Sequence, residues 1–148
     1  MNMNNKKKKY AGTKKPAQKM MTKAQSAPRG EIEEYLYMLP VEVRAEDLLE
    51  VIEAPQEKKD VWHELDLMEI RLKHEGLIFE NFMDCFESKS DRAFLEENGV
   101  KKVYAFSYDS LDKAEAAKAV REIYAAFGGF IASDTKDLQP VYQPEEFK

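Results

Sequence analysis

The side chains best suited to nucleophilic or metal chemistry are few in this sequence. The chain has one cysteine, Cys85, and two histidines, His63 and His74. A cysteine nucleophile needs a thiolate beside a base. Cys85 lies between Asp84 and Phe86 in an aromatic-rich stretch, where an acidic neighbour and burial both disfavour a thiolate. We therefore expect Cys85 to be a small buried hydrophobic residue, and we assign no catalytic residue.

Metal, phosphate and acid–base chemistry find little support in the spacing of residues. Zinc sites use ligand pairs a few residues apart, and the cysteine and histidines show no such pairs. Gly128 and Gly129 follow an apolar helical pattern, so they lie at the end of the helix dipole that repels anions. Neighbouring carboxylates abound, but acid–base catalysis needs one that is buried with a shifted pKa. The sequence predicts a non-enzymatic protein without metal or cofactor, and an unrecognised carboxylate site stays open as an alternative.

Charge is segregated along the chain. Nine of the 23 Lys and Arg residues lie in the first 30 positions, and all 28 Asp and Glu residues follow them. The formal charge is +9 before residue 31 and −14 after it. A block of like charges repels itself, stays hydrated and resists collapse. The pattern predicts a disordered basic arm over residues 1–30 and a single α+β domain over residues 31–148.

The lysine cluster of the basic arm is the candidate contact with nucleic acid, because lysines neutralise phosphates without reading sequence. The same cluster is compatible with a nuclear import signal, an anionic membrane or the acidic part of this chain. A dispensable solvated extension is a further alternative. The candidate residues are Lys6, Lys7, Lys8, Lys9, Lys14 and Lys15.

The apolar pattern after the arm predicts alternating strands and helices. An aromatic-rich run stopped by Pro40 predicts a strand over 32–39. A helical stripe predicts a helix over 44–53. Residues 61–72 fit both a strand and a helix, and we expect a strand.

The second half of the chain predicts three helices and two strands. The second of these three helices is capped by Asp91 and ends at Gly99, and a strand over 103–108 follows it. The broadest apolar face predicts a helix from Ser110 to Phe127, and then a short strand over 130–132. The first of the three helices is predicted by an i, i+3, i+4, i+7 set: Phe79, Phe82, Met83 and Phe86.

This element order predicts a fold class of α+β with a ferredoxin-like plan. In that plan a doubled βαβ unit forms an antiparallel sheet with helices on one face. Residues 73–102 are then a helical insertion between the halves, and a different α+β topology stays open. Because strand 130–132 is short, we expect it at the sheet edge, where it could pair with its copy in a homodimer.

Three aromatic residues have a second interpretation. Tyr104 and Phe106 follow Lys102 on the strand before the alanine-rich helix, and Tyr37 lies on the first strand. This arrangement resembles the RNA-recognition motif over about 30 residues, which implies that the three rings stack on bases. Val103 stands where that family usually has glycine, and the two strands are further apart in sequence than is usual.

Packing favours the opposite orientation of that strand. With its rings outward the strand would bury Val103, Ala105 and Ser107, which make a poor core. Turned over, it buries Tyr104 and Phe106 and removes far more apolar surface from water, at about 25 cal/mol per Å². An acidic domain would also repel phosphates. We therefore expect these rings in the core.

We expect the acidic domain to act as a protein-binding or regulatory module through its surface charge. The alternative is a nucleic-acid-binding protein that uses the basic arm, assisted by Tyr37, Tyr104 and Phe106. A single cysteine and the lack of an export signal or a bilayer-spanning apolar run indicate the cytoplasm.

Overall fold

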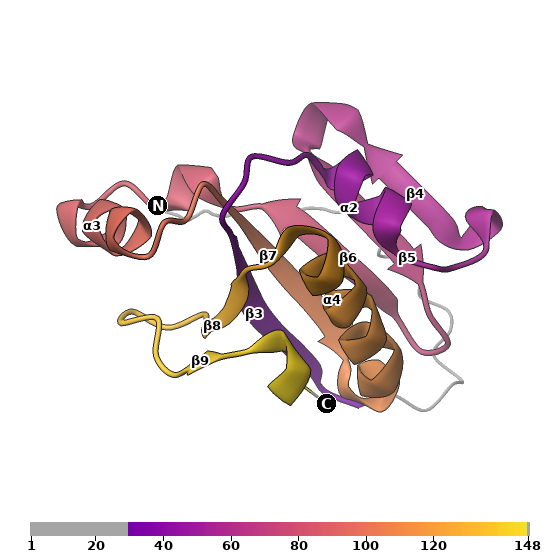
Figure 1. The fold of residues 1–148 in the computed structure, drawn as a ribbon. Coiled ribbons are helices and arrows are strands. Elements are labelled where there is room, and N and C mark those ends of the chain that lie inside the picture. Colours follow the sequence, from indigo (N-terminus) through magenta and orange to yellow (C-terminus); the bar gives the residue numbers. More distant parts are fainter. Residues whose placement is uncertain (1–29, 148) are drawn as a thin grey trace.

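A computed structural model of the chain describes residues 30–147 (Figure 1). Its helices are α2 (Ala45–Val51), α3 (Lys89–Glu97) and α4 (Lys113–Phe127). Its strands are β3 (Ile32–Leu39), β4 (Lys59–Trp62), β5 (Leu67–Arg71), β6 (Gly76–Asn81), β7 (Lys102–Asp109), β8 (Phe130–Ser133) and β9 (Val141–Tyr142). The predicted α+β class is confirmed.

All the strands join one antiparallel sheet. Their order across the sheet is β4-β5-β6-β7-β3-β8-β9. The chain starts in β3 in the interior of the sheet, crosses to β4 at one edge, and then returns through β5 and β6 to β7, which lies beside β3. This seven-strand order differs from the four strands of a simple doubled βαβ unit, so the sheet does not by itself establish a ferredoxin-like topology.

Helices α2 and α4 lie together on one face of the sheet (Figure 1). Each turns an apolar stripe toward the strands, as an amphipathic helix must when it covers a sheet. The main core lies between these two layers. Its largest fully buried members from the strands are Tyr37, Leu39, Met68, Leu77, Phe79, Tyr104, Phe106 and Tyr108, and those from the helices are Leu48 and Ile123.

A smaller core lies on the opposite face, at the end of the sheet beneath α3. Leu36, Met38 and Val103 point from the strands into it. Phe86 and Leu95 pack onto them from α3 and the segment before it. Because α3 covers only this end, the rest of that face carries no helix among the described residues (Figure 1).

The register of β3 and β7 fixes which side chains enter the main core. Tyr35 pairs with Phe106, and Tyr37 pairs with Tyr104. Tyr104 is 0% exposed and Phe106 is 1% exposed. Since side chains alternate along a strand, the rings share the helix-covered face, and the packing orientation expected from the sequence is confirmed.

Aromatic contacts tie the C-terminal segment to this core. The rings of Phe79 and Phe106 stack with centroids 4.9 Å apart. Phe147 lies edge-on to Phe106 at 5.8 Å and to Tyr35 at 5.3 Å. Such geometries suit the ring quadrupoles, so residues near the end of the chain help close the core.

The predicted helix over Phe79–Phe86 is wrong. Phe79 belongs to β6, and a short 3-10 helix over Met83–Cys85 follows it. The apolar set fits a helical period, but Leu77 and Phe79 also alternate as a strand does, and pairing with β5 and β7 decides between them. The stretch 73–102 is therefore not a wholly helical insertion.

The predicted strand over residues 61–72 is interrupted. β4 ends at Trp62, a 3-10 helix spans His63–Leu65, and β5 begins at Leu67. Asp66 lies between them in the left-handed region with φ of 52°. A left-handed residue reverses the chain, so one expected strand becomes a hairpin.

Several local expectations also need correction. Ser88, rather than Asp91, caps α3, since its hydroxyl accepts from the Asp91 amide at 3.1 Å. Ser110 opens a 3-10 helix, and α4 begins at Lys113. Cys85 is exposed, not buried. The strand expected at the edge, β8, pairs with β9 on its outer side.

If the ring of Phe106 is a core element, the Phe106→Ala variant loses about 3–5 kcal/mol of unfolding free energy, because a large buried side chain leaves a cavity. Urea unfolding measures this loss. Phe94→Ala in the partly buried edge of the smaller core is the matched control with a smaller loss. A loss below about 1 kcal/mol for Phe106→Ala would contradict its burial.

Candidate functional site

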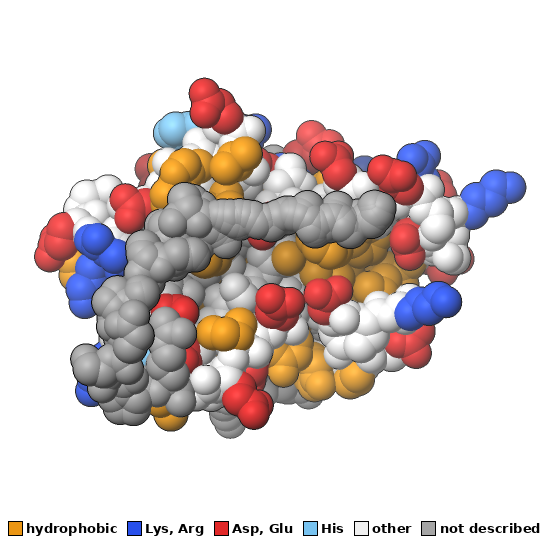
Figure 2. All heavy atoms as spheres, turned by 180° about the vertical axis from the view of Figure 1, so that it is seen from behind, with side chains coloured by type: hydrophobic (Ala, Val, Ile, Leu, Met, Phe, Trp, Pro, Cys, Tyr) orange, Lys and Arg blue, Asp and Glu red, His pale blue; other side chains and the backbone are white. Residues whose placement is uncertain are grey.

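The candidate site is the open face, which we define as the surface of β4, β5, β6, β7 and β3 that points away from α2 and α4. Figure 2 shows this face, with carboxylates and hydrophobic side chains lying together on it. One line of register partners crosses all five strands. We call it the acidic row, and its members are Asp60, Glu69, Ile78, Ser107 and Glu34.

The acidic row places like charges next to one another. Asp60 lies directly opposite Glu69 across β4 and β5. Directly opposed like charges destabilise a sheet. With strands about 4.8 Å apart, five strands span roughly 19 Å. The row is therefore a line across the sheet that contains three carboxylates, two of which are directly opposed.

Further carboxylates crowd one end of the row. Burial raises the pKa of the Glu34 carboxyl above its ordinary value, and the charges of Asp134 and Glu80 raise it further. Burial likewise raises the pKa of Asp134. Between residues 30 and 147, neither Glu34 nor Asp134 forms an ion pair. A cation placed here would relieve the repulsion.

The line of register partners next to the acidic row is mostly apolar. It contains Trp62, Leu67, Glu80, Ala105 and Leu36, of which Leu36 is buried in the smaller core and is not available at the surface. Trp62 is 37% exposed. The open face thus presents an acidic line beside an apolar line, which suits an extended segment with basic and apolar side chains.

Cations are scarce on the open face. Among the described strand residues that point this way, Arg71 is the single basic one by register. Its guanidinium donates to the carbonyl of Glu57 at the edge of the sheet. Carboxylates therefore outnumber basic side chains among the described strand residues of this face.

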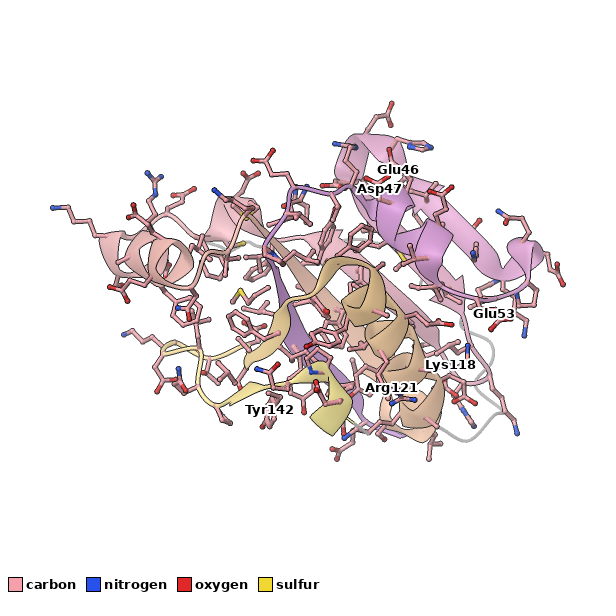
Figure 3. The ribbon with its side chains drawn as sticks, in the orientation of Figure 1. Glu46, Asp47, Glu53, Lys118, Arg121 and Tyr142 are labelled. Carbon is pink, nitrogen blue, oxygen red and sulfur yellow. The ribbon has the colours of Figure 1, made fainter. Side chains whose placement is uncertain are left out.

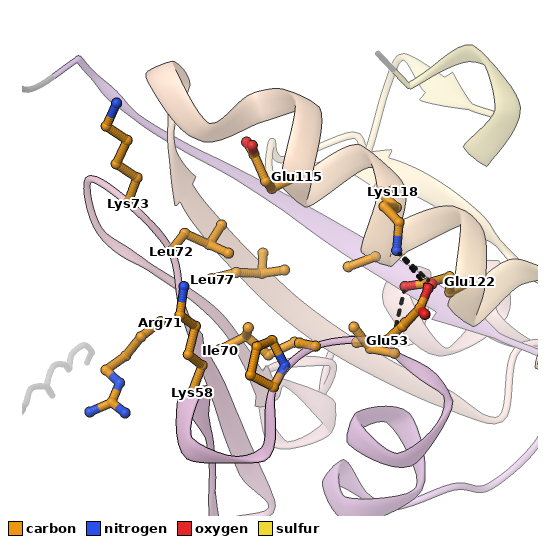
Figure 4. A pocket seen from close by; sticks show the side chains of 14 residues that line it. Glu53, Lys58, Ile70, Arg71, Leu72, Lys73, Leu77, Glu115, Lys118 and Glu122 are labelled. Carbon is orange, nitrogen blue, oxygen red and sulfur yellow. Dashed lines mark hydrogen bonds and ion pairs between the residues drawn. The ribbon is translucent and has the colours of Figure 1, made fainter.

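A second concave feature lies on the helix-covered face, between α4 and the β5–β6 hairpin (Figure 4). This groove encloses about 510 Å³ over an apolar floor. Ile70 and Leu77 contribute to the floor, and Lys58 and Lys73 line the hairpin side. Its walls carry both signs of charge, so its electrostatics favour no single class of ligand.

Ion pairs close one side of the groove. Lys118 on α4 faces Glu53 beyond α2 at 3.5 Å (Figure 3), and it lies 2.9 Å from Glu122 (Figure 4). Glu122 also accepts from the Glu53 amide at 3.2 Å. Exposed pairs of this kind contribute about 0–1 kcal/mol each. Their role is to hold α4 near the end of α2.

Asp66 organises a buried polar network at the start of α2. Its carboxylate accepts from the Ala45 amide at 2.8 Å and from the Tyr104 hydroxyl at 2.7 Å. The ammonium of Lys102 lies 2.7 Å away, and the amide of Asn81 donates at 3.0 Å. Four donors satisfy the buried charge, so the network is structural in character.

The titration of this network follows from its donors. Burial alone would raise the pKa of Asp66, but hydrogen bonds from Lys102, Tyr104 and the Ala45 amide, with the charge of Lys102, hold it below its ordinary value. Burial and the bond to Asp66 raise the pKa of the Tyr104 hydroxyl, so it remains a donor. The carboxylate form is the one that the fold stabilises.

His74 and Asp112 form the arrangement closest to a catalytic dyad. The Nδ1 atom of His74 lies 2.7 Å from Asp112, which also accepts from the amides of His74 and Glu75. A carboxylate that orients a histidine supplies two members of a triad, which still requires a nucleophile as the third. The pair pins the β5–β6 turn to the start of α4.

Metal chemistry finds no geometric support in the described part of the chain. Residues 30–147 contain no group of three or more His, Cys, Asp or Glu placed to hold an ion. His63 contacts Glu46 at 3.4 Å, whereas His74 contacts Asp112. The residues weighed for a zinc site are thus engaged separately.

The site residues named from the sequence fall into two groups. Lys6, Lys7, Lys8, Lys9, Lys14 and Lys15 lie outside the described residues. Tyr37, Tyr104 and Phe106 are brought together, but they lie in the main core beneath the helices. Rings that are 0–1% exposed offer no surface on which a base could stack in this conformation.

Sequence reasoning did not identify the acidic row. The alternation of Met68 and Ile70 with Glu69 and Arg71 was visible, and it indicates which carboxylate points outward. The register that aligns Glu69 with Asp60 and Glu34 is a property of distant pairing. Composition alone could not reveal it, because carboxylates are common in this chain.

Comparison with protein-family models, curated proteins and solved structures found no match to this chain. No helix between residues 30 and 147 combines the length and apolar character that crossing a bilayer requires. The candidate site therefore rests on the geometry of this chain.

The Asp66 network predicts a specific pH dependence. Because the folded pKa of Asp66 is depressed, its stabilising contribution is present above the unfolded value near 3.8 and is lost as pH falls through the folded value. Asp66→Asn leaves Lys102 without its buried partner, and we expect a loss of about 3–5 kcal/mol at pH 7.

Urea unfolding from pH 7 to pH 2 measures both effects. The difference between parent and Asp66→Asn should shrink as the pH falls. Asp84→Asn on the exposed 3-10 helix is the control, for which the difference should stay near zero throughout. A pH-independent loss in Asp66→Asn would show that packing, and not the charge, explains the network.

Proposed function

We propose that this chain is a non-enzymatic protein-binding module whose open face recognises a basic, extended segment of a partner protein. The observation that carries the proposal is the acidic row, in which Asp60, Glu69 and Glu34 align across five strands. Charge complementarity of this kind steers association and selects partners.

The cost of the row supports a binding role. Like charges opposed on a sheet destabilise it. Partial burial raises the pKa of Glu34 and of Asp134, although both residues are exposed, and neighbouring carboxylates raise the pKa of Glu34 further. Functional surfaces often lie where a fold departs from its stability optimum. A basic partner would compensate these charges, whereas nothing in the core requires them.

The apolar line beside the row supports an extended peptide as the ligand. A segment that alternates basic and apolar residues would place ammonium groups over the acidic row and apolar groups over Trp62 and Leu67. A nucleic acid strand would instead bring phosphates against the carboxylates, which repel them. The open face therefore favours protein over nucleic acid.

Three finer proposals accompany this function. The strands β6-β7-β3-β8 are proposed as a ferredoxin-like core, since this neighbour order interleaves two βαβ units, with β4, β5 and β9 as additions. A cytoplasmic location is proposed from the single cysteine. A homodimer, if formed through a sheet edge, would use β4 or β9 as the outermost strands.

A binding assay separates protein recognition from nucleic-acid recognition. The probes are a fluorescent ten-residue peptide of alternating Lys and Val, and a single-stranded oligonucleotide of mixed sequence. The protein is the full chain and a variant of it that we call the arm-neutral chain. In this variant Lys6–Lys9, Lys14 and Lys15 are changed to Gln, which lowers the formal charge of residues 1–30 from +9 to +3. We expect the arm-neutral chain to bind the peptide and not the oligonucleotide.

Two charge-matched double variants, made in the arm-neutral chain, locate the site. Glu34→Gln with Asp60→Asn removes two carboxylates of the acidic row, and we expect about five- to tenfold weaker peptide binding, since each pair contributes up to about 1 kcal/mol. Glu50→Gln with Glu97→Gln removes two exposed carboxylates from α2's surface and from α3 and should change binding less than twofold. Equal weakening by both doubles would refute recognition by the open face, and binding of the oligonucleotide alone would favour the nucleic-acid alternative.

A further inference from the structure

The basic arm joins the described domain beside the open face. The amide of Gly30 donates to both carboxylate oxygens of Asp109 at 3.0 and 3.1 Å, and the amide of Glu31 donates to the Ser110 hydroxyl at 3.1 Å. A Cβ on Gly30 would lie 2.2 Å from that hydroxyl, so the close approach suits glycine. These contacts fix Gly30, to which residues 1–29 are attached, beside the end of β7.

The junction leads directly to the acidic row. Ile32 and Glu34 follow on β3, and both point to the open face by register. Glu34 lies four residues after Gly30, which corresponds to about 13 Å at the rise of an extended chain. The point at which the basic arm is attached therefore lies about 13 Å along the chain from Glu34.

Length and charge match the site. Residues 1–29 span at most roughly 95 Å when extended, at about 3.3 Å per residue, so each lysine can reach a row only about 19 Å long. They carry nine positive charges and no negative charge. The open face carries carboxylates in a line, and the described strands place one arginine there, at its edge.

We propose that the basic arm binds the open face of its own chain and competes with the basic segment of a partner. This inference rests on the proposed role of the open face and adds a regulatory element to it. A tethered segment acts at an effective concentration of about millimolar. A weak arm contact therefore suffices to lower the apparent affinity for a partner segment.

Competition gives the first test, with the Lys–Val peptide as probe. At low salt we expect the arm-neutral chain to bind it about tenfold more tightly than the parent chain. The advantage should disappear in about 0.5 M NaCl, because salt screens exposed charges. The matched control removes six exposed charges from the folded part, namely Lys58, Lys73, Lys89, Arg92, Lys101 and Lys136, each to Gln. Equal tightening in that control would mean that net charge alone acts, and the proposal would fail.

Proximity gives the second test, on the intact full chain. A carbodiimide joins an amine to a carboxylate only when the two are in contact, and peptide mass spectrometry locates the bond. We expect links from Lys6–Lys23 to Glu34, Asp60 or Asp134, and few to Glu50 or Glu97. Mixing chains labelled with light and heavy isotopes distinguishes links within one chain from links between chains. Links between chains only, or links spread evenly over all exposed carboxylates, would overturn the proposal.

The outcomes separate this inference from the proposed function. If parent and arm-neutral chains bind the peptide equally and no links to the open face form, self-binding fails while recognition by the open face stands. If neither chain binds the peptide, yet links to the open face form, partner recognition fails and the arm is a structural part of the fold.

Trp62, the single tryptophan, lies on the open face, and its fluorescence emission should shift to longer wavelength in the arm-neutral chain.

Discussion

The two-residue period of a β-strand is the constraint on which this structure depends. Along β7, Tyr104, Phe106 and Tyr108 must share one face, and the residues between them must take the other. Because the large rings are buried beneath α2 and α4, the residues that alternate with them must point to the opposite face of the sheet. A slip of one residue would exchange the two faces, so the core and the acidic row are consequences of one register.

The buried network around Asp66 fixes that register at the end of the sheet. It joins the turn before β5 to the start of α2 through Ala45 and to β7 through Tyr104 and Lys102. A buried charge with several donors tolerates little displacement. The network thus couples the position of α2 to the strand whose rings it covers. Charge has a structural role on this side of the sheet and a proposed recognition role on the other.

Much of the local structure could be read from the sequence, because it depends on neighbours in the chain. The strand that ends before Pro40 has the predicted bounds of 32–39, and the strand that carries Tyr104 and the helix before Gly128 were also recognised. These segments have one dominant period and clear end signals. The burial of Tyr104 followed from comparing the two faces of its strand.

The features that the sequence did not predict depend on pairing between strands that are far apart in the chain. The residues from Leu77 to Phe86 fit two periods, and only the partners β5 and β7 select a strand for the first part. The left-handed Asp66 divides an expected strand, and its conformation is supported by donors far away in sequence. The acidic row needs the register of five strands at once. The sequence alone does not identify such a row, because carboxylates are common in this chain and each one, taken singly, is typical of a solvated surface residue.

The most direct measurement of the central claim is an NMR titration of individual carboxyl groups in the full chain. In the arm-neutral chain we expect the pKa values of Glu34 and Asp134 to be raised from their ordinary values and the pKa of Asp66 to be lowered from its ordinary value. Addition of the Lys–Val peptide should lower the pKa of Glu34 and leave that of Asp66 unchanged, because an opposite charge nearby favours the ionised form. An ordinary pKa for Glu34 that the peptide does not move would contradict the account.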